Sequence, residues 1–140
     1  DTAGSSSQRA PGDASRLGDD CRTRIPRDLA ALAHAWCDPA AWSGMTRAGG
    51  IELPGEVAGI IALDELVIHG WDVARAAGQV YDCDPVSLDV VHGFVVQMAG
   101  PGQEAVREGL FGPVVPVPDD APLFDRVIGL SGRHPNWSPG

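Results

Sequence analysis

A central stretch of the chain, from roughly Gly55 to Ala77, constrains the fold most, because apolar residues recur in it at helical spacing on almost every side. The main apolar stripe consists of Ile60, Leu63, Val67, Trp71 and Ala74. Leu66 and Val73 widen this stripe, and Ile61 and Ile68 carry apolar surface onto the third side. A helix that is apolar almost all round is usually buried in the middle of a bundle. The stretch therefore predicts a buried central helix.

Shorter helical patterns lie on both sides of this stretch and make the chain all-α in class. The predicted helices run from about Pro26 to Cys37, from Asp84-Pro85 to Gly100, near Gln103–Gly109, and from about Pro122 to Leu130. Residues 43–53 are rich in turn formers and are expected to be extended, as in a short hairpin. The run 110–118 contains prolines that exclude a helix and most sheet positions. It predicts an extended Pro-rich segment before the last helix.

Composition divides the chain into a short tail and one domain. Residues 1–18 are rich in Ser, Gly, Asp and Arg with almost no apolar residues, which predicts a flexible tail. Residues 19–140 are expected to form one helical-bundle domain, because 140 residues with 44% apolar composition support a single modest core. Because the sequence begins with Asp1 rather than Met, we expect a fragment or processed form whose bundle is truncated at its N-terminus.

Charge and cysteine usage exclude several classes of partner and location. A net charge of −9 argues against nucleic acid, whose phosphates attract basic surfaces. The sequence contains no run of about 18 apolar residues and no basic and apolar start typical of a secretory signal. Cys21, Cys37 and Cys83 are widely spaced without a Cys-x-x-Cys pair, which favours free thiols in a reducing cytoplasm.

Within the central stretch, Glu65 and His69 are the main candidates for chemistry. Residues four apart share one face of a helix, so the carboxylate and the imidazole are expected to point together. Such a pair is half of a typical divalent-metal site, or an acid–base pair. Because burial of the pair without a partner is costly, a metal, another ligand or hydrogen bonds must satisfy it. The alternative is a structural His, satisfied by the carboxylate, with Asp72 or Arg75 nearby.

A metal site requires about three protein ligands, and only two are evident in this stretch. His34, on the inner side of the first predicted helix, is a candidate third ligand. The interpretation that we favour for it is a half-buried His near a helix end. His92 is expected to be a core or interface residue and His134 a tail residue.

Other catalytic signatures are weak in this sequence. Ser43, Ser87 and Ser131 lack a Gly-x-Ser-x-Gly elbow, so a hydrolase triad is unsupported. No Gly-rich phosphate loop follows a predicted strand. A stress- or thiol-linked sensor that uses Cys37 or Cys83 is a further hypothesis.

Four segments of the chain resemble a known family. They are Leu53-Pro-Gly-Glu-Val-Ala-Gly, Asp64-Glu-Leu-Val-Ile-His-Gly-Trp-Asp-Val-Ala-Arg-Ala-Ala-Gly-Gln79, Leu110-Phe-Gly-Pro-Val-Val-Pro-Val-Pro-Asp-Asp-Ala-Pro, and Gly132-Arg-His-Pro-Asn-Trp137. Over roughly residues 16–137 the chain resembles the DinB-like, mycothiol-dependent maleylpyruvate isomerase-type metal-binding family, in its short single-domain branch. The His-Gly-Trp-Asp run is the strongest motif of this resemblance.

The resemblance implies an up-down four-helix bundle that holds a divalent metal, zinc or nickel, through three ligands. Glu65 and His69 match the family's Glu-x-x-x-His pair. The third ligand of the family is a His on an early helix, in a segment that this chain is expected to lack, and His34 does not match it by position. Members of known activity use the metal to activate the thiol of mycothiol, or a similar nucleophile, for isomerisation or transfer.

Two hypotheses of different classes follow. The first is a cytoplasmic metal-binding bundle, with Glu65 and His69 as ligands, Asp72 orienting His69, and a small-molecule or thiol substrate. The second is a non-catalytic structural or oligomerising module whose metal site is incomplete. Such a module would bury its apolar helix faces by forming a homodimer or by pairing with a missing N-terminal part.

Overall fold

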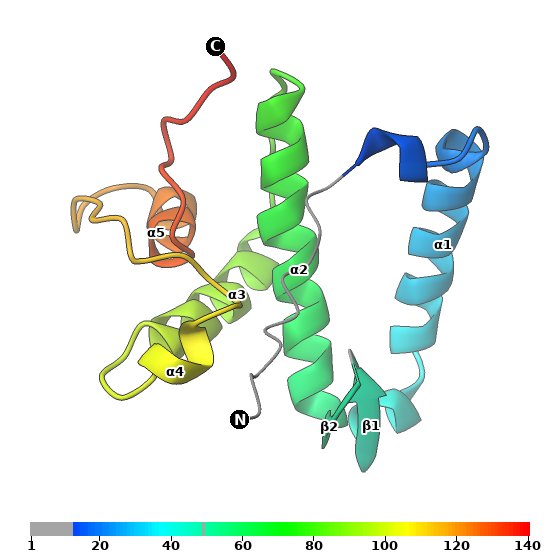
Figure 1. The fold of residues 1–140 in the computed structure, drawn as a ribbon. Coiled ribbons are helices and arrows are strands. Elements are labelled where there is room, and N and C mark those ends of the chain that lie inside the picture. Colours follow the sequence, from blue (N-terminus) through cyan, green and yellow to red (C-terminus); the bar gives the residue numbers. More distant parts are fainter. Residues whose placement is uncertain (1–12, 49) are drawn as a thin grey trace, which may run out of the picture. The chain divides into compact units, whose positions relative to one another are not determined.

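The computed structural model describes residues 13–48 and 50–140, which are mostly helical with one two-stranded sheet (Figure 1). The chain divides into two compact units, one that ends at Pro39 and one that spans Ala40–Gly140. The predicted helical class is thus confirmed, with a hairpin added, whereas a single domain over 19–140 stays a prediction.

The first unit contains a short 3-10 helix, η1 (Ala14–Arg16), and one α-helix, α1 (Cys21–Trp36). The predicted start of α1 at Pro26 is wrong, because the helix begins at Cys21 and Pro26 lies inside it. The N–H groups of Thr23 and Arg24 already donate to the carbonyl of Asp20, so a helical turn forms ahead of the proline. Of the predicted tail, residues 1–12 lie outside the described part of the chain.

A 3-10 turn, η2 (Pro39–Trp42), spans the boundary into the second unit, and a hairpin follows that leads into the central helix. Strands β1 (Met45–Ala48) and β2 (Ile51–Pro54) pair antiparallel, which confirms the predicted hairpin. The indole of Trp42 lies against Gly59 of the central helix, where a Cβ atom would be 2.5 Å from the ring. This close approach fixes the hairpin end of the helix to the turn before it.

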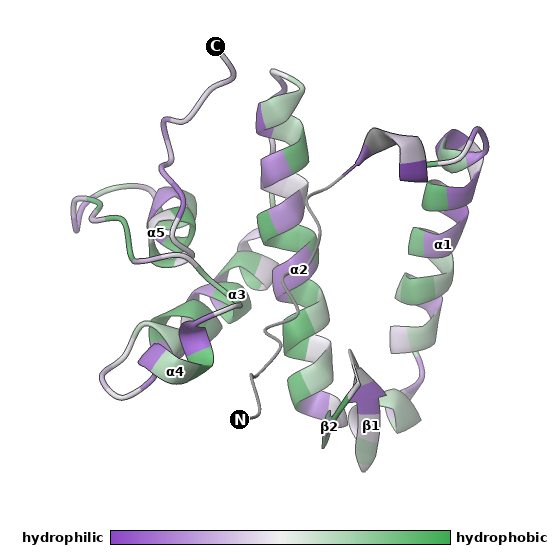
Figure 2. Ribbon diagram, in the orientation of Figure 1, coloured by the Kyte–Doolittle hydropathy of each residue, from purple (hydrophilic) through white to green (hydrophobic). Residues whose placement is uncertain are grey.

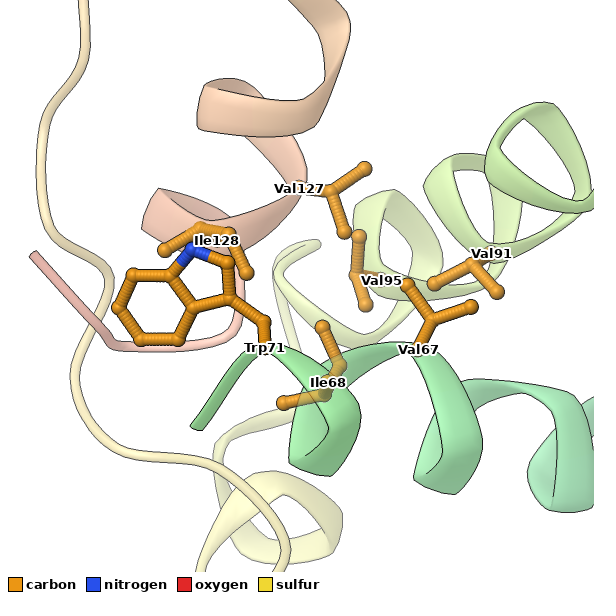
Figure 3. Close-up of a cluster of buried hydrophobic side chains, with 7 residues drawn as sticks. All are labelled: Val67, Ile68, Trp71, Val91, Val95, Val127 and Ile128. Carbon is orange, nitrogen blue, oxygen red and sulfur yellow. The ribbon is translucent and has the colours of Figure 1, made fainter. Parts of the chain in front are cut away.

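The core of this unit is built by three helices, α2 (Gly55–Ala76), α3 (Pro85–Met98) and α5 (Leu123–Leu130). Helix α3 contacts both of the others. It starts as predicted, with the Asp84 side chain accepting a hydrogen bond of 2.9 Å from the N–H of Ser87. The side chains that point toward one another in the core are Val67, Ile68, Trp71, Val91, Val95, Val127 and Ile128 (Figure 3).

Helix α2 is covered on one side only, so the prediction of a helix buried all round is wrong. Val67, Ile68 and Trp71 face α3 and α5 and are at most 5% exposed. Leu66 and Val73, on the row expected to widen the stripe, are 43% and 70% exposed. Figure 2 shows that apolar residues extend along α2. The pattern of apolar residues is therefore wider than the face that neighbouring helices cover.

The segment between α3 and α5 packs against α5. After the short helix α4 (Glu104–Arg107), which is shorter than predicted, residues 111–121 form no helix or strand, as expected from their prolines. The N–H of Val115 donates to the carbonyl of Gly129, and a Cβ atom at Gly129 would lie 2.7 Å from the Val115 carbonyl oxygen. Farther on, Arg133 contacts Asp72 of α2, and the carbonyl of Pro135 accepts a hydrogen bond from Arg75 of α2. Across the described ranges, no helix is both long and apolar enough to span a membrane.

Candidate functional site

A small pocket lies beside the middle of α2, at the point where the C-terminal segment returns. Its volume is about 60 Å³. Polar residues of α2, apolar residues of α2, α3 and the extended segment, and one arginine that follows α5 line it: Ile61, Asp64, Glu65, Ile68, His69, Phe94, Leu110, Phe111 and Arg133. Both residues of the predicted metal pair therefore belong to one concave site.

The pair itself lies at the edge of this pocket rather than in the core. Glu65 Oε2 and His69 Nε2 are 3.2 Å apart, as expected from their spacing of four residues. Each side chain is 59% exposed, so the expectation of a buried pair is wrong. The reason is that α3 and α5 cover the opposite side of α2. Solvent can satisfy both groups, and burial alone does not require a metal here.

Asp72 holds the other nitrogen of the His69 ring. Its Oδ2 atom is 2.9 Å from His69 Nδ1, and the same carboxylate accepts bonds of 2.7 Å and 2.8 Å from Arg133 Nε and Nη2. Partial burial opposes the charge of this carboxylate, but the hydrogen bonds from Arg133 and His69 outweigh it and lower the pKa of Asp72. When Nδ1–H donates to Asp72, the neutral ring carries its lone pair on Nε2, beside Glu65.

Asp64 is the functional candidate that sequence reasoning did not select. Its side chain is 5% exposed, and its Oδ1 atom has no hydrogen-bond partner among the described residues. Burial and the neighbouring charge of Glu65 raise the pKa of Asp64 to about 6, although the charges of Arg133 and His69 act in the opposite direction. A signal was present in the sequence, because Asp64 shares a helix face with Ile68 and Trp71, which are buried.

Arg133 is the second residue that was missed, although it belongs to the C-terminal motif. It reaches Asp72 across 61 residues of sequence, so helical periodicity could not find the contact. Its Nη1 atom lies 3.3 Å from the carbonyl oxygen of Ser131. Nearby, Arg75 donates a 2.7 Å bond to the carbonyl of Pro135 and lies over the ring of Trp71. These contacts fix residues 131–135 against α2.

The Glu65 and His69 side chains match part of the geometry of a divalent-metal site. Two ligands bound to one zinc at about 2.1 Å and a near-tetrahedral angle lie about 3.4 Å apart. The separation of 3.2 Å between Glu65 and His69 is close to that value. Residues 13–48 and 50–140 contain no group of three or more His, Cys, Asp or Glu side chains placed to hold a metal. The described residues thus offer two ligands of such a site.

The other sequence candidates lie elsewhere. His34 is an exposed residue of α1 in the first unit, not the half-buried residue expected. His92 is half-buried on α3, and its Nε2 atom is 3.3 Å from Arg126 Nη2. The exposed His134 lines a larger pocket of about 370 Å³ together with Trp137, close to the Asp72–Arg133 pair.

The cysteines form no disulfide. All three of them, each within the described part, are free thiols, as predicted. Burial, reinforced by the charges of Asp84 and Asp82, raises the pKa of Cys83 and disfavours its thiolate. A thiol-based sensor at Cys83 has no support from this environment.

Comparison with known proteins gives no family for this chain. No family model, no curated protein sequence and no solved structure matches this chain. The resemblance to the DinB-like family therefore remains a proposal, argued from the sequence motifs and from the arrangement of the Glu65 and His69 side chains.

Proposed function

We propose that this chain is a metal-binding helical domain of the DinB-like, mycothiol-dependent isomerase type, in which Glu65 and His69 bind one divalent ion. The observation that carries the proposal is the approach of Glu65 Oε2 to His69 Nε2, 3.2 Å, at the mouth of a pocket. The ring nitrogen that faces away from Glu65 is held by Asp72. A carboxylate on the second nitrogen is the usual support of a metal-ligating histidine.

The residues around the pair would each have a separate task. Asp72 keeps the His69 lone pair on the side of Glu65, and Arg133 holds Asp72 in place through two hydrogen bonds. The apolar wall from Phe94 and Phe111 restricts water behind the pair. A bound zinc or nickel ion would supply a Lewis acid that lowers the pKa of a coordinated thiol or water. Such chemistry suits a thiol-using isomerase or transferase with mycothiol as the thiol.

The third protein ligand would come from outside this group of residues. His34, which the sequence suggested for this role, belongs to the first unit of the chain. A His on a further segment or on a second copy of the chain is the alternative. Either source leaves the roles of Glu65 and His69 the same, so those two residues are the ones to test.

Metal binding can be measured by calorimetry with zinc or nickel. We expect wild type to bind one ion, and His69→Ala and Glu65→Gln each to weaken binding at least tenfold because each removes a ligand. Asp72→Asn should weaken metal binding about 10–100-fold, because the His69 ring is no longer held in its orientation. His92→Ala, which removes a histidine of another helix, is the matched control and should bind as wild type does. Equal and negligible binding in wild type and His69→Ala would refute the proposal.

A second candidate function, a self-associating module, is favoured by the uncovered apolar side of α2. Leu66 and Val73 are 43% and 70% exposed there and lie on one side of the helix. A homodimer, or pairing with another helical segment, would cover them. Sedimentation at about 100 µM protein distinguishes the two functions: a monomer rules out self-association, and a dimer that Val73→Lys dissociates supports it.

A further inference from the structure

The inner end of the pocket holds a carboxylate that the proposed metal site does not use. Asp64 lines the pocket and is only 5% exposed. Its Oδ1 atom has no hydrogen-bond partner among the described residues. A buried polar atom without a hydrogen bond costs about 1–3 kcal/mol, and more when it is charged. Native proteins seldom leave such an atom unsatisfied, so Asp64 points to an occupant that donates a hydrogen bond.

The charges that face Asp64 favour a cationic occupant. The charge of Glu65 opposes ionisation of Asp64, and the charge of Arg133, joined by that of His69 whenever its ring is protonated, acts in the opposite direction. The guanidinium of Arg133, however, is held by Asp72 through two hydrogen bonds. His69 likewise lies between Glu65 and Asp72. The side chains of Arg133 and His69 thus already have carboxylate partners, and the Asp64 carboxylate is left with unsatisfied acceptor capacity.

The walls and the volume define the size of the occupant. Apart from its charged residues, the pocket is lined by Ile61, Ile68, Phe94, Leu110 and Phe111. These walls suit a short hydrocarbon chain, and a phenyl face attracts an organic cation. A water molecule requires about 10–15 Å³ of such space, so the volume of about 60 Å³ holds roughly four or five heavy atoms.

We propose that this pocket binds a small primary alkylammonium group, whose N–H donates to Asp64 Oδ1 while its short chain lies against Phe94 and Phe111. The ligand class is thus a short-chain amine, or the amine end of a larger molecule that extends past Glu65 and His69 to solvent. An ordered water on Asp64 Oδ1 is the competing occupant, and it would show no selectivity among organic solutes. The inference depends on Asp64 rather than on the proposed metal ligands.

The test is a titration of the wild-type chain with propylammonium, followed by backbone amide chemical shifts in the presence of EDTA. Propanol and propionate, of similar size but neutral and anionic, are titrated in parallel at equal ionic strength. We expect saturable shifts near Asp64 and Phe111 for propylammonium and at least tenfold weaker binding of the other two solutes. Bulky tert-butylammonium should also bind at least tenfold more weakly, because the pocket is small. Equal responses to all four solutes, or no saturable response, would overturn the proposal.

Substitution of Asp64 provides a second test of the proposal. Asp64→Asn keeps the size of the side chain, and we expect it to weaken propylammonium binding at least tenfold. Asp89→Asn, which removes an exposed carboxylate of α3, is the matched control and should bind as wild type does. Unchanged affinity in Asp64→Asn would contradict the role of Asp64. Because EDTA removes metal ions, failure of amine binding would not count against the proposed metal site. Failure of metal binding would likewise not count against the amine site.

Discussion

At the scale of single residues, three carboxylates on one helix have three different surroundings. Glu65 is largely in solvent, Asp72 is held by Arg133 and His69, and Asp64 is buried with one oxygen unpaired. The pKa of Asp72 is lowered, whereas the pKa of Asp64 is raised to about 6. The difference follows from the hydrogen bonds that each carboxylate receives, since both are withdrawn in part from water.

The raised pKa of Asp64 predicts a stability that falls as the pH rises. An Asp in the unfolded chain has a pKa near 3.9, so between about pH 4 and pH 6 the folded protein binds more protons than the unfolded one. Stability from this group is complete below pH 4 and is lost as the pH passes through 6. We expect Asp64→Asn to remove this loss and to be about 1–2 kcal/mol more stable than wild type at pH 8.

Urea unfolding of the metal-free protein at pH 4 and pH 8 measures this effect. Asp89→Asn is the matched control and should keep the wild-type difference between the two pH values. If Asp64→Asn showed the same difference as wild type, the burial of an unpaired carboxylate would be the wrong account of this site.

At the scale of elements, two glycines within helices α2 and α3 show how the surroundings of a glycine decide its effect on packing. Gly59 of α2 has no room for a side chain, since a Cβ atom would be 2.5 Å from the Trp42 ring. Gly93 of α3 is the opposite case, because a Cβ atom there would meet nothing within 4 Å. The two glycines lie on helices of one unit and differ chiefly in their surroundings.

This contrast predicts opposite results for the same substitution. Gly59→Ala should destabilise the fold by about 1–3 kcal/mol, because Trp42 or the helix must shift. Gly93→Ala should stabilise it by about 0.5–1 kcal/mol, since alanine favours a helix over glycine. Thermal or urea unfolding of both variants checks the prediction. A stabilising Gly59→Ala would mean that Trp42 does not pack on α2.

At the scale of the whole molecule, the packed core belongs to one unit only. Helices α2, α3 and α5 share the buried side chains, whereas none of the 16 residues described in α1 is buried. Helical stability in proteins comes mainly from the packing of an apolar face. Within its own unit, helix α1 is stabilised by its backbone hydrogen bonds and by local ion pairs such as Arg24 with Asp28.

Hydrogen exchange should reveal this difference. We expect amides of α1 to exchange at least tenfold faster than those of α2 near Val67 and Ile68, because opening α1 exposes little buried surface. Exchange followed by mass spectrometry or NMR measures both regions in one sample. Equal protection of α1 and α2 would contradict the prediction and would indicate that α1 is packed in solution.

Much of the helical content could be predicted because helix signals are local. Asp84 and Pro85 start α3 at the expected place, and the prolines between 110 and 118 exclude regular structure there. The start of α1 could not be predicted from Pro26, because proline favours the first turn of a helix, whereas Pro26 lies inside α1. The exposure of Leu66 was missed because periodicity reports which residues are apolar and not which of them a neighbour covers.

The sequence alone determined that Glu65 and His69 meet, since a spacing of four residues on a helix brings two side chains together whatever surrounds them. Only the tertiary structure decided that this pair is exposed, that Asp64 is buried beside it, and that Arg133 holds Asp72. The physical reason is the distance along the chain over which each effect acts. Backbone geometry acts over one or two turns, whereas burial and charge pairing depend on segments that folding brings together from distant parts of the chain.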